Sequence, residues 1–169
     1  MSDQKSLVVL VIGASTGIGR ATASLLAQKG HRVFATSRDA SRIDLQGVEA
    51  LSLDVFDEAS IDRSVAHVID RAGRLDALVY SAGFYVTGAV EESSLDDVLD
   101  QMHAYFFGAV RAARSVLPHM RANSFGRLTF MSSTAGTVAI PFHAAYSASK
   151  GALGRWVEAL AYEVEPFNI

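Results

Sequence analysis

Hydrophobic positions along the chain follow two alternating patterns. Short apolar runs, dense in valine, isoleucine and leucine, are typical of strands buried on both faces of a sheet. Between these runs, apolar residues recur three or four positions apart, which predicts amphipathic helices. The apolar runs predict strands at 7–12, 32–37, 48–53, 75–80 and 128–131. The spaced segments predict helices at 17–29, 94–117 and 145–164. A further helix is predicted to begin at a cap at 57 or 60 and to extend through 69.

This alternation of strands and helices predicts an α/β fold. Parallel strands need long connections, and helical connections cover both faces of the sheet. Ligands of such sheets bind beyond the carboxyl ends of the strands. The residues that directly follow each predicted strand are therefore the candidates for a functional site.

Composition narrows the class of protein. The chain has 169 residues, a net charge of −3, a 50% share of hydrophobic residues and no cysteine, which excludes a disordered chain, disulfides and thiolate metal sites. It has no basic stripe for nucleic acid, and its longest early apolar run, 7–12, is far shorter than the roughly 20 residues of a membrane span. None of the five histidines has a carboxylate partner at i,i+4 spacing, so no metal site is predicted. These features predict a single globular domain in the cytoplasm.

A glycine-rich loop, GASTGIG at 13–19, joins the first predicted strand to the first predicted helix. A strand that turns directly into a helix presents backbone N–H groups and the positive end of the helix dipole to an anion. Glycines leave room where a Cβ would block a pyrophosphate. The spacing differs from that of a P-loop, so the loop indicates a dinucleotide site; the alternative is a flexible turn that is merely rich in glycine.

The second predicted strand ends at Ser37 and Arg38. NAD sites place an acidic residue there, which accepts from the ribose 2′-hydroxyl, whereas a hydroxyl and a guanidinium suit a 2′-phosphate. This position favours NADP(H) over NAD(H). Asp39 restores the NAD alternative if the strand ends one or two residues later, and a solvated loop arginine is the other alternative.

Further candidates follow the third and fourth predicted strands. Asp54 is a candidate acceptor for an adenine amino group, or else a loop or capping aspartate. Ala82 and Gly83 allow a ligand to pass close to the backbone. The next residues, 84–86, are candidates for an apolar pocket wall or for ordinary core packing.

Ser133, Tyr146 and Lys150 carry the chemistry that the sequence predicts. A spacing of four places Tyr146 and Lys150 on one helical face, and Ser133 follows the fifth predicted strand. A nearby ammonium lowers the pKa of a tyrosine, which can then exchange a proton with a carbonyl or alcohol oxygen. A serine hydroxyl stabilises charge on the same oxygen, and a nicotinamide supplies the hydride. The alternative is an ordinary exposed helix pair.

These segments, with the LPHM sequence at 117–120, resemble the classical short-chain dehydrogenase/reductase family in order and spacing over essentially the whole chain. The resemblance implies a Rossmann-type, doubly wound parallel sheet with helices on both faces, in three layers. It implies Tyr146 as catalytic acid/base, Lys150 as the residue that binds the nicotinamide ribose and tunes Tyr146, and Ser133 as the residue that orients the substrate. It also implies a homodimer or homotetramer. The implied cofactor-binding residues are Gly13, Ser15, Thr16, Gly17, Ile18, Gly19, Ser37, Arg38, Asp54, Val55, Ala82, Gly83, Tyr146 and Lys150.

The chain departs from the family pattern at three places. Ile12 stands where the family has threonine, Tyr80 and Ser81 replace two asparagines, and Tyr105 replaces a helix asparagine that supports a water-mediated proton relay to the lysine. At Tyr105 two alternatives stay open: the phenol blocks the relay water, or it replaces that water with its own hydroxyl.

The expected function is hydride transfer between NADP(H) and a carbonyl or secondary alcohol, with a small-molecule substrate that the sequence does not name. The alternative is an NADP(H)-binding sensor or scaffold without turnover, which the departures at Ile12 and Tyr105 make plausible. The retained Ser133, Tyr146 and Lys150 favour the enzyme, because a protein that only binds would not need the serine. The sequence ends at Ile169, where the resemblance calls for a sixth strand. We therefore expect residues 1–169 to be one NAD(P)-binding Rossmann domain that is truncated before that strand.

Overall fold

A computed structural model describes residues 6–169 of the chain. The described residues form five strands: β1 (Val8–Ile12), β2 (Arg32–Ser37), β3 (Val48–Ser52), β4 (Ala77–Tyr80) and β5 (Arg127–Phe130). The α-helices are α1 (Gly17–Gln28), α2 (Glu58–Ala72), α3 (Leu95–Met102), α4 (Gly108–Ala122) and α5 (Ala144–Val164). A π-helix, His103–Phe107, joins α3 to α4, and short 3₁₀ helices lie at Ala40–Arg42, Thr134–Gly136 and Glu165–Phe167.

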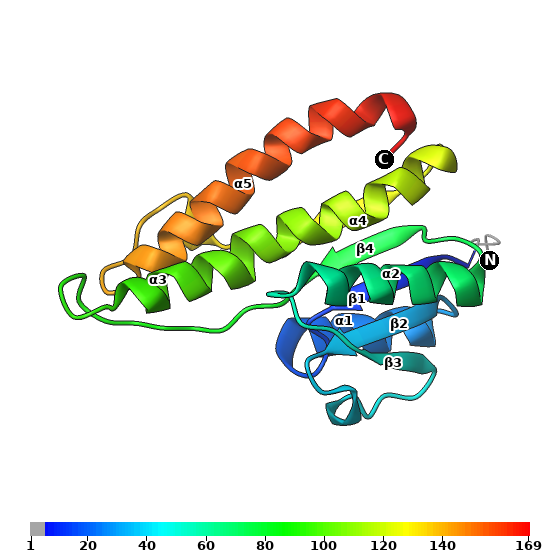
Figure 1. The fold of residues 1–169 in the computed structure, drawn as a ribbon, viewed down its shortest axis with the longest axis horizontal. Helices are drawn as coiled ribbons and strands as arrows, with labels where there is room; N and C mark the ends of the chain where they lie inside the picture. Colours follow the sequence, from blue (N-terminus) through cyan, green and yellow to red (C-terminus); the bar gives the residue numbers. More distant parts are fainter. Residues whose placement is uncertain (1–5) are drawn as a thin grey trace.

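The strands form one parallel sheet in the order β3-β2-β1-β4-β5. Figure 1 labels the first four of these strands in that order. The strand order reverses beside β1: β2 and β3 extend to one side of it, and β4 and β5 to the other. All five residues of β1 are buried, as expected for an apolar run at the centre of the sheet. Ligands of doubly wound sheets bind at such a reversal, beyond the carboxyl ends of the strands.

Helices cover both faces of the sheet, so the predicted three-layer Rossmann-type fold is confirmed. Alternate residues of β1 point to opposite faces. Val9 and Val11 pack in a cluster with Ala23 of α1. Leu10 packs on the other face in the main core cluster, to which α2, α4 and α5 contribute; their buried members include Ile61, Val116 and Leu153.

The helix predicted at 94–117 is longer than expected and is interrupted. It continues through Pro118 to Ala122, and the five residues of the π-helix widen it after Met102. A proline inside a helix costs about 3 kcal/mol because it removes one hydrogen bond and crowds the preceding turn. Met120, beyond the proline, is fully buried, and burial of such a side chain contributes a similar amount, roughly 1.5–3 kcal/mol. Burial therefore carries the helix past the residue at which it was predicted to end.

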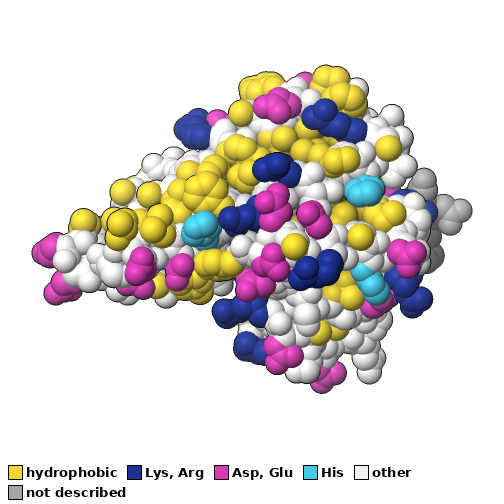
Figure 2. Space-filling view, in the orientation of Figure 1, with side chains coloured by type: hydrophobic (Ala, Val, Ile, Leu, Met, Phe, Trp, Pro, Cys, Tyr) yellow, Lys and Arg dark blue, Asp and Glu magenta, His cyan; other side chains and the backbone are white. Residues whose placement is uncertain are grey.

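Hydrophobic side chains gather on the surface over α3, α4 and α5, as Figure 2 shows. Leu95, Leu99 and Phe107 are exposed on α3 and the π-helix, and Tyr162 is exposed on α5. Within residues 6–169, no helix has both the length and the apolar character that crossing a membrane requires.

Candidate active site

A cleft of about 330 Å³ lies at the carboxyl ends of β1, β2, β3 and β4. Most of the residues predicted to bind a cofactor line it, although they come from four separate segments of the chain. The predicted residues along the cleft are Gly13, Ser15, Thr16, Gly17, Ile18, Ser37, Arg38, Asp54, Val55, Ala82 and Gly83. Ile12, Leu53, Phe56, Ser81, Phe84 and Ala104 complete the lining.

The glycine-rich loop turns tightly against the end of β4. Gly13 has a φ of +87°, and a Cβ there would lie 2.6 Å from the Ala82 nitrogen. A Cβ on buried Gly19, which lies behind the cleft lining, would overlap the Gly13 carbonyl. Thr16 precedes α1 without a side-chain hydrogen bond to it, so the helix N-terminus is not capped from within. The Gly13 and Ala14 N–H groups donate to the Thr36 carbonyl, at 3.1 and 2.8 Å. The backbone N–H groups that remain for an anion are therefore those at the uncapped start of α1.

Arg38 and Asp39, directly after β2, have different surroundings. The strand ends at Ser37, as predicted, and Arg38 is an exposed residue of the cleft lining. The Asp39 carboxylate instead accepts hydrogen bonds from the Ser41 nitrogen at 3.0 Å and the Ser41 hydroxyl at 2.7 Å. These bonds lower the pKa of Asp39 and cap the 3₁₀ helix that follows. The Ser37 hydroxyl donates to the Asp39 carbonyl.

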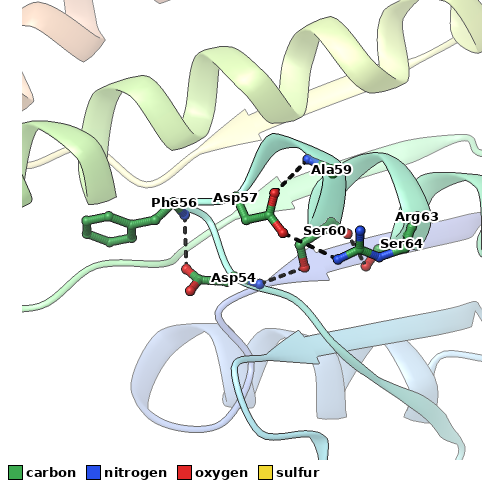
Figure 3. Close-up of polar contacts among 7 residues, drawn as sticks. All are labelled: Asp54, Phe56, Asp57, Ala59, Ser60, Arg63 and Ser64. Carbon is green, nitrogen blue, oxygen red and sulfur yellow. Dashed lines mark hydrogen bonds and ion pairs between the residues drawn. The ribbon is translucent and has the colours of Figure 1, made fainter.

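Asp54 lies in the cleft at the turn between β3 and α2 (Figure 3). One carboxylate oxygen accepts from the Phe56 nitrogen at 3.0 Å, and the Asp54 nitrogen donates to the Ser60 hydroxyl at 3.1 Å. Of the two predicted caps, Asp57 is the one at the N-terminus of α2, where it accepts from the Ala59 nitrogen at 2.9 Å. Asp54 therefore stabilises its own turn with one oxygen and also borders the cleft.

The predicted catalytic residues lie near the carboxyl end of β5 and in the first turns of α5. Ser133 precedes a 3₁₀ helix, and its hydroxyl oxygen accepts from the Ala135 nitrogen at 3.1 Å. Lys150 is 5% exposed, and its Nζ donates to the Met131 carbonyl at 2.6 Å and lies 5.8 Å from the centroid of the Tyr146 ring. Burial lowers the pKa of Lys150 to about 8.

Tyr105 lies between the cleft and the predicted catalytic pair. Its ring centroid is 4.2 Å from the Lys150 Nζ and 5.2 Å from the Tyr146 ring centroid. Its hydroxyl donates to the Phe84 carbonyl at 2.6 Å, and burial raises its pKa to about 12. Tyr105 thus presents its ring face to the ammonium, while its hydroxyl proton is engaged at Phe84.

The segment after β4, which was predicted to form either a pocket wall or part of the core, contacts both the cleft and Tyr146. Phe84 lines the cleft, and the ring of Tyr85 lies 4.9 Å from that of Tyr146, centroid to centroid. Gln101 of α3 is buried and donates from Nε2 to the Val86 carbonyl at 3.3 Å. Gln101 and Tyr105 lie one helical turn apart and bind alternate carbonyls of the same segment. No motif marks Gln101, and only its place one turn before Tyr105 relates it to the site.

Comparison with known proteins places this geometry in a family. The family model described as short chain dehydrogenase matches residues 7–169. A 3-ketodihydrosphingosine reductase of Bacteroides thetaiotaomicron is 40% identical over 162 residues, which are 96% of this chain and 60% of that protein. A 3-dehydrosphinganine reductase of Danio rerio is 31% identical, over 95% of this chain and 53% of that protein. The chain thus spans little more than half the length of these relatives.

Solved structures agree with the sequence comparison. The crystal structure of a short-chain dehydrogenase from Streptomyces avermitilis superposes with a TM-score of 0.94 at 39% identity. The match covers 98% of this chain and 63% of that one. Because the family model spans almost the whole chain and the fold matches a solved member at 39% identity, this chain belongs to the short-chain dehydrogenase family of oxidoreductases.

Proposed function

We propose that residues 1–169 form the NADP(H)-binding part of an oxidoreductase that transfers a hydride between NADP(H) and a carbonyl or secondary alcohol. The observation that carries this proposal is the position of the buried Lys150 ammonium, beside Tyr146 and one ring away from the cleft wall. Binding of the nucleotide alone would not require a phenol beside this cation, whereas proton exchange at a substrate oxygen would.

The cleft suits a dinucleotide phosphate. The uncapped start of α1 would hold the pyrophosphate, and Asp54 and Val55 would lie along the adenine side. The position of Asp39 supports NADP(H) over NAD(H): its Oδ1 is bonded to Ser41, and the lining of the cleft includes Arg38 but not Asp39. Arg38, an exposed residue of the cleft lining, would bind the 2′-phosphate through a charge-assisted fork.

The chain's own groups would handle the proton. NADPH, when bound, supplies the hydride. Tyr146 would donate its proton to the carbonyl oxygen as general acid, or take one from an alcohol in the reverse direction. The positive charge of Lys150 favours the phenolate that this exchange produces. Ser133 accepts from Ala135 through a lone pair, so its O–H would be left to bond the substrate oxygen.

The names of the relatives support a ketone as substrate. One relative, at 40% identity, is a 3-ketodihydrosphingosine reductase, and a keto group is what the proposed acid would protonate.

A homodimer or homotetramer and a cytoplasmic location remain proposals. Exposed apolar side chains such as Tyr162 on α5 support the association of copies, which light scattering on the purified protein would measure.

The test is Tyr146→Phe, which removes the proton donor and keeps the ring. We expect turnover of a panel of ketones, followed at the nicotinamide absorbance, to fall by roughly 10²–10⁴-fold, as for the loss of a general acid. NADPH should still raise the unfolding temperature of the variant, because a ligand of the native state stabilises it.

Two outcomes would contradict the proposal. Turnover retained by Tyr146→Phe would remove the role given to that residue. A wild-type chain that binds NADPH and reduces no ketone would support the alternative, an NADP(H)-binding sensor or scaffold. Tyr162→Phe, an exposed tyrosine at the other end of the same helix, is the matched control and should leave turnover unchanged.

A further inference from the structure

Lys150 is a buried cation that is held without a carboxylate. It is 5% exposed, and among residues 6–169 it forms no ion pair. A buried ammonium needs compensation, because water no longer solvates it. Two groups supply it: the Met131 carbonyl, which accepts from Nζ at 2.6 Å, and the face of the Tyr105 ring, whose centroid is 4.2 Å from Nζ.

The Tyr105 ring is fixed from several sides. Its hydroxyl donates to the Phe84 carbonyl at 2.6 Å, and a Cβ on Gly83 would overlap the ring, so the ring packs directly on the backbone of that glycine. Gln101, one turn earlier, holds the neighbouring Val86 carbonyl. The Tyr146 ring meets it edge to face, at 5.2 Å and 74°. These contacts leave the ring one position, with a face toward Nζ.

The geometry favours Tyr105 over Tyr146 as the aromatic partner of the ammonium. A cation within about 6 Å of a ring centroid is attracted by the negative ring face, and the attraction falls with distance. Nζ is 4.2 Å from the Tyr105 centroid and 5.8 Å from that of Tyr146. Tyr146 thus keeps its ring and hydroxyl available for the reacting oxygen, while Tyr105 binds the charge.

We propose that Tyr105 is a positioning residue that holds the Lys150 ammonium on its ring face and so keeps the positive charge beside Tyr146. This arrangement argues against the alternative in which the Tyr105 hydroxyl replaces the relay water, because that hydroxyl donates to the Phe84 carbonyl. The effect of Tyr105 on turnover rests on the proposed function. Its effect on the charge of Lys150 does not.

The titratable groups that face the ammonium are few. Tyr105 faces it from the π-helix and Tyr146 from α5, while β5 contributes only the Met131 carbonyl at its end. Tyr85 lies beyond, against the Tyr146 ring. A weaker ring face at position 105 would therefore act on Lys150 directly, with no carboxylate nearby to compensate for it among the residues that the structure describes.

The test varies the ring charge and keeps the ring shape. Phenylalanine and its mono-, di- and trifluorinated forms are placed at position 105 in the full chain, because each fluorine weakens the negative ring face. The Nζ signals of ¹⁵N-labelled lysine are then followed by NMR against pH. We expect Tyr105→Phe to titrate close to wild type and the pKa of Lys150 to fall stepwise with fluorination, by roughly one unit in total. Lys29, which is exposed, should not move.

Turnover provides the second readout. The value of kcat/KM should change with pH as Lys150 loses its charge, and this part of the pH profile should move to lower pH together with the Lys150 pKa measured by NMR. A purely structural defect would lower kcat without moving that part of the profile. A Lys150 titration that stays constant across the fluorinated series would overturn the proposal. Absence of ketone reduction by the wild type would instead count against the proposed function, and the NMR titration would still decide the role of the ring. The same fluorinated phenylalanines at Tyr162, which is exposed, serve as the control and should leave the Lys150 titration unchanged.

Discussion

At the scale of single residues, the end of β2 separates two charges that the sequence places side by side. Asp39 is engaged by Ser41 through both the backbone and the hydroxyl, whereas Arg38 lines the cleft. The Asp39 carboxylate stabilises the turn that follows β2, and the same hydrogen bonds lower its pKa. The charge that a bound nucleotide would meet here is therefore the guanidinium.

Arg38→Gln tests this arrangement. A charge-assisted hydrogen bond to phosphate contributes about 1.5–3 kcal/mol, so we expect the Kd for NADPH to rise roughly 10- to 100-fold. The Kd for NADH should change little, because that cofactor has no 2′-phosphate. Fluorescence titration with each cofactor measures both. Arg32→Gln, at the opposite end of the same strand, is the control, and an equal loss for NADPH and NADH in Arg38→Gln would contradict the prediction.

At the scale of elements, two helical glycines have opposite surroundings. Gly108 begins α4 directly beneath Tyr80, and a Cβ there would overlap the Tyr80 hydroxyl. That hydroxyl is buried and donates to the Ala104 carbonyl of the π-helix at 2.6 Å. Gly154, inside α5, has no atom within 4 Å of its Cβ position among the described residues. The first glycine allows two elements to approach closely, and the second only weakens its helix.

Alanine at these two positions should therefore act with opposite sign. Gly108→Ala should lower the free energy of unfolding by roughly 2–4 kcal/mol, through overpacking and the displaced Tyr80 hydrogen bond. Gly154→Ala should raise it by roughly 0.5–1 kcal/mol, the ordinary gain of alanine over glycine in a helix. Urea denaturation of both variants gives the values. Loss of stability in Gly154→Ala would mean that this face of α5 is covered in solution.

The strands and helices differ in how far the sequence alone predicts them. The strands and the order of helices follow from local patterns, because β1 is an uninterrupted apolar run and α2 has a regular stripe with Asp57 as its cap. The cleft also follows, since the residues after each strand meet at one edge. The π-helix and the passage of α4 through Pro118 do not follow, because they depend on burial against distant elements. The ring contact of Tyr105 with Lys150 joins residues 45 positions apart and has no local signal.

At the scale of the whole molecule, Lys150 stands out among the basic side chains. Only three of the 15 basic side chains are lysines, and arginines keep their charge throughout this range. Lys150 has a pKa of about 8 in the folded chain against 10.5 as its ordinary value. The unfolded chain therefore binds more protons than the folded chain between these two values, and stability contributed by Lys150 rises with pH across that window. Tyr105, with a pKa raised to about 12, acts in the opposite direction only above about pH 10.

Lys150→Met isolates this contribution, because methionine keeps an unbranched side chain and does not titrate. Below pH 8 the wild type carries the full cost of its buried charge, and that cost is relieved as the pH rises toward 10.5. The free energy of unfolding of the wild type should therefore gain on that of Lys150→Met by roughly 2–3 kcal/mol between pH 7 and 10, at about 1.4 kcal/mol per unit of pKa difference. Urea denaturation at half-unit steps of pH measures both curves, and Lys29→Met, which removes an exposed lysine, should run parallel to the wild type. Parallel curves for Lys150→Met and the wild type would instead show that the Met131 carbonyl and the Tyr105 ring compensate the buried charge as fully as water does.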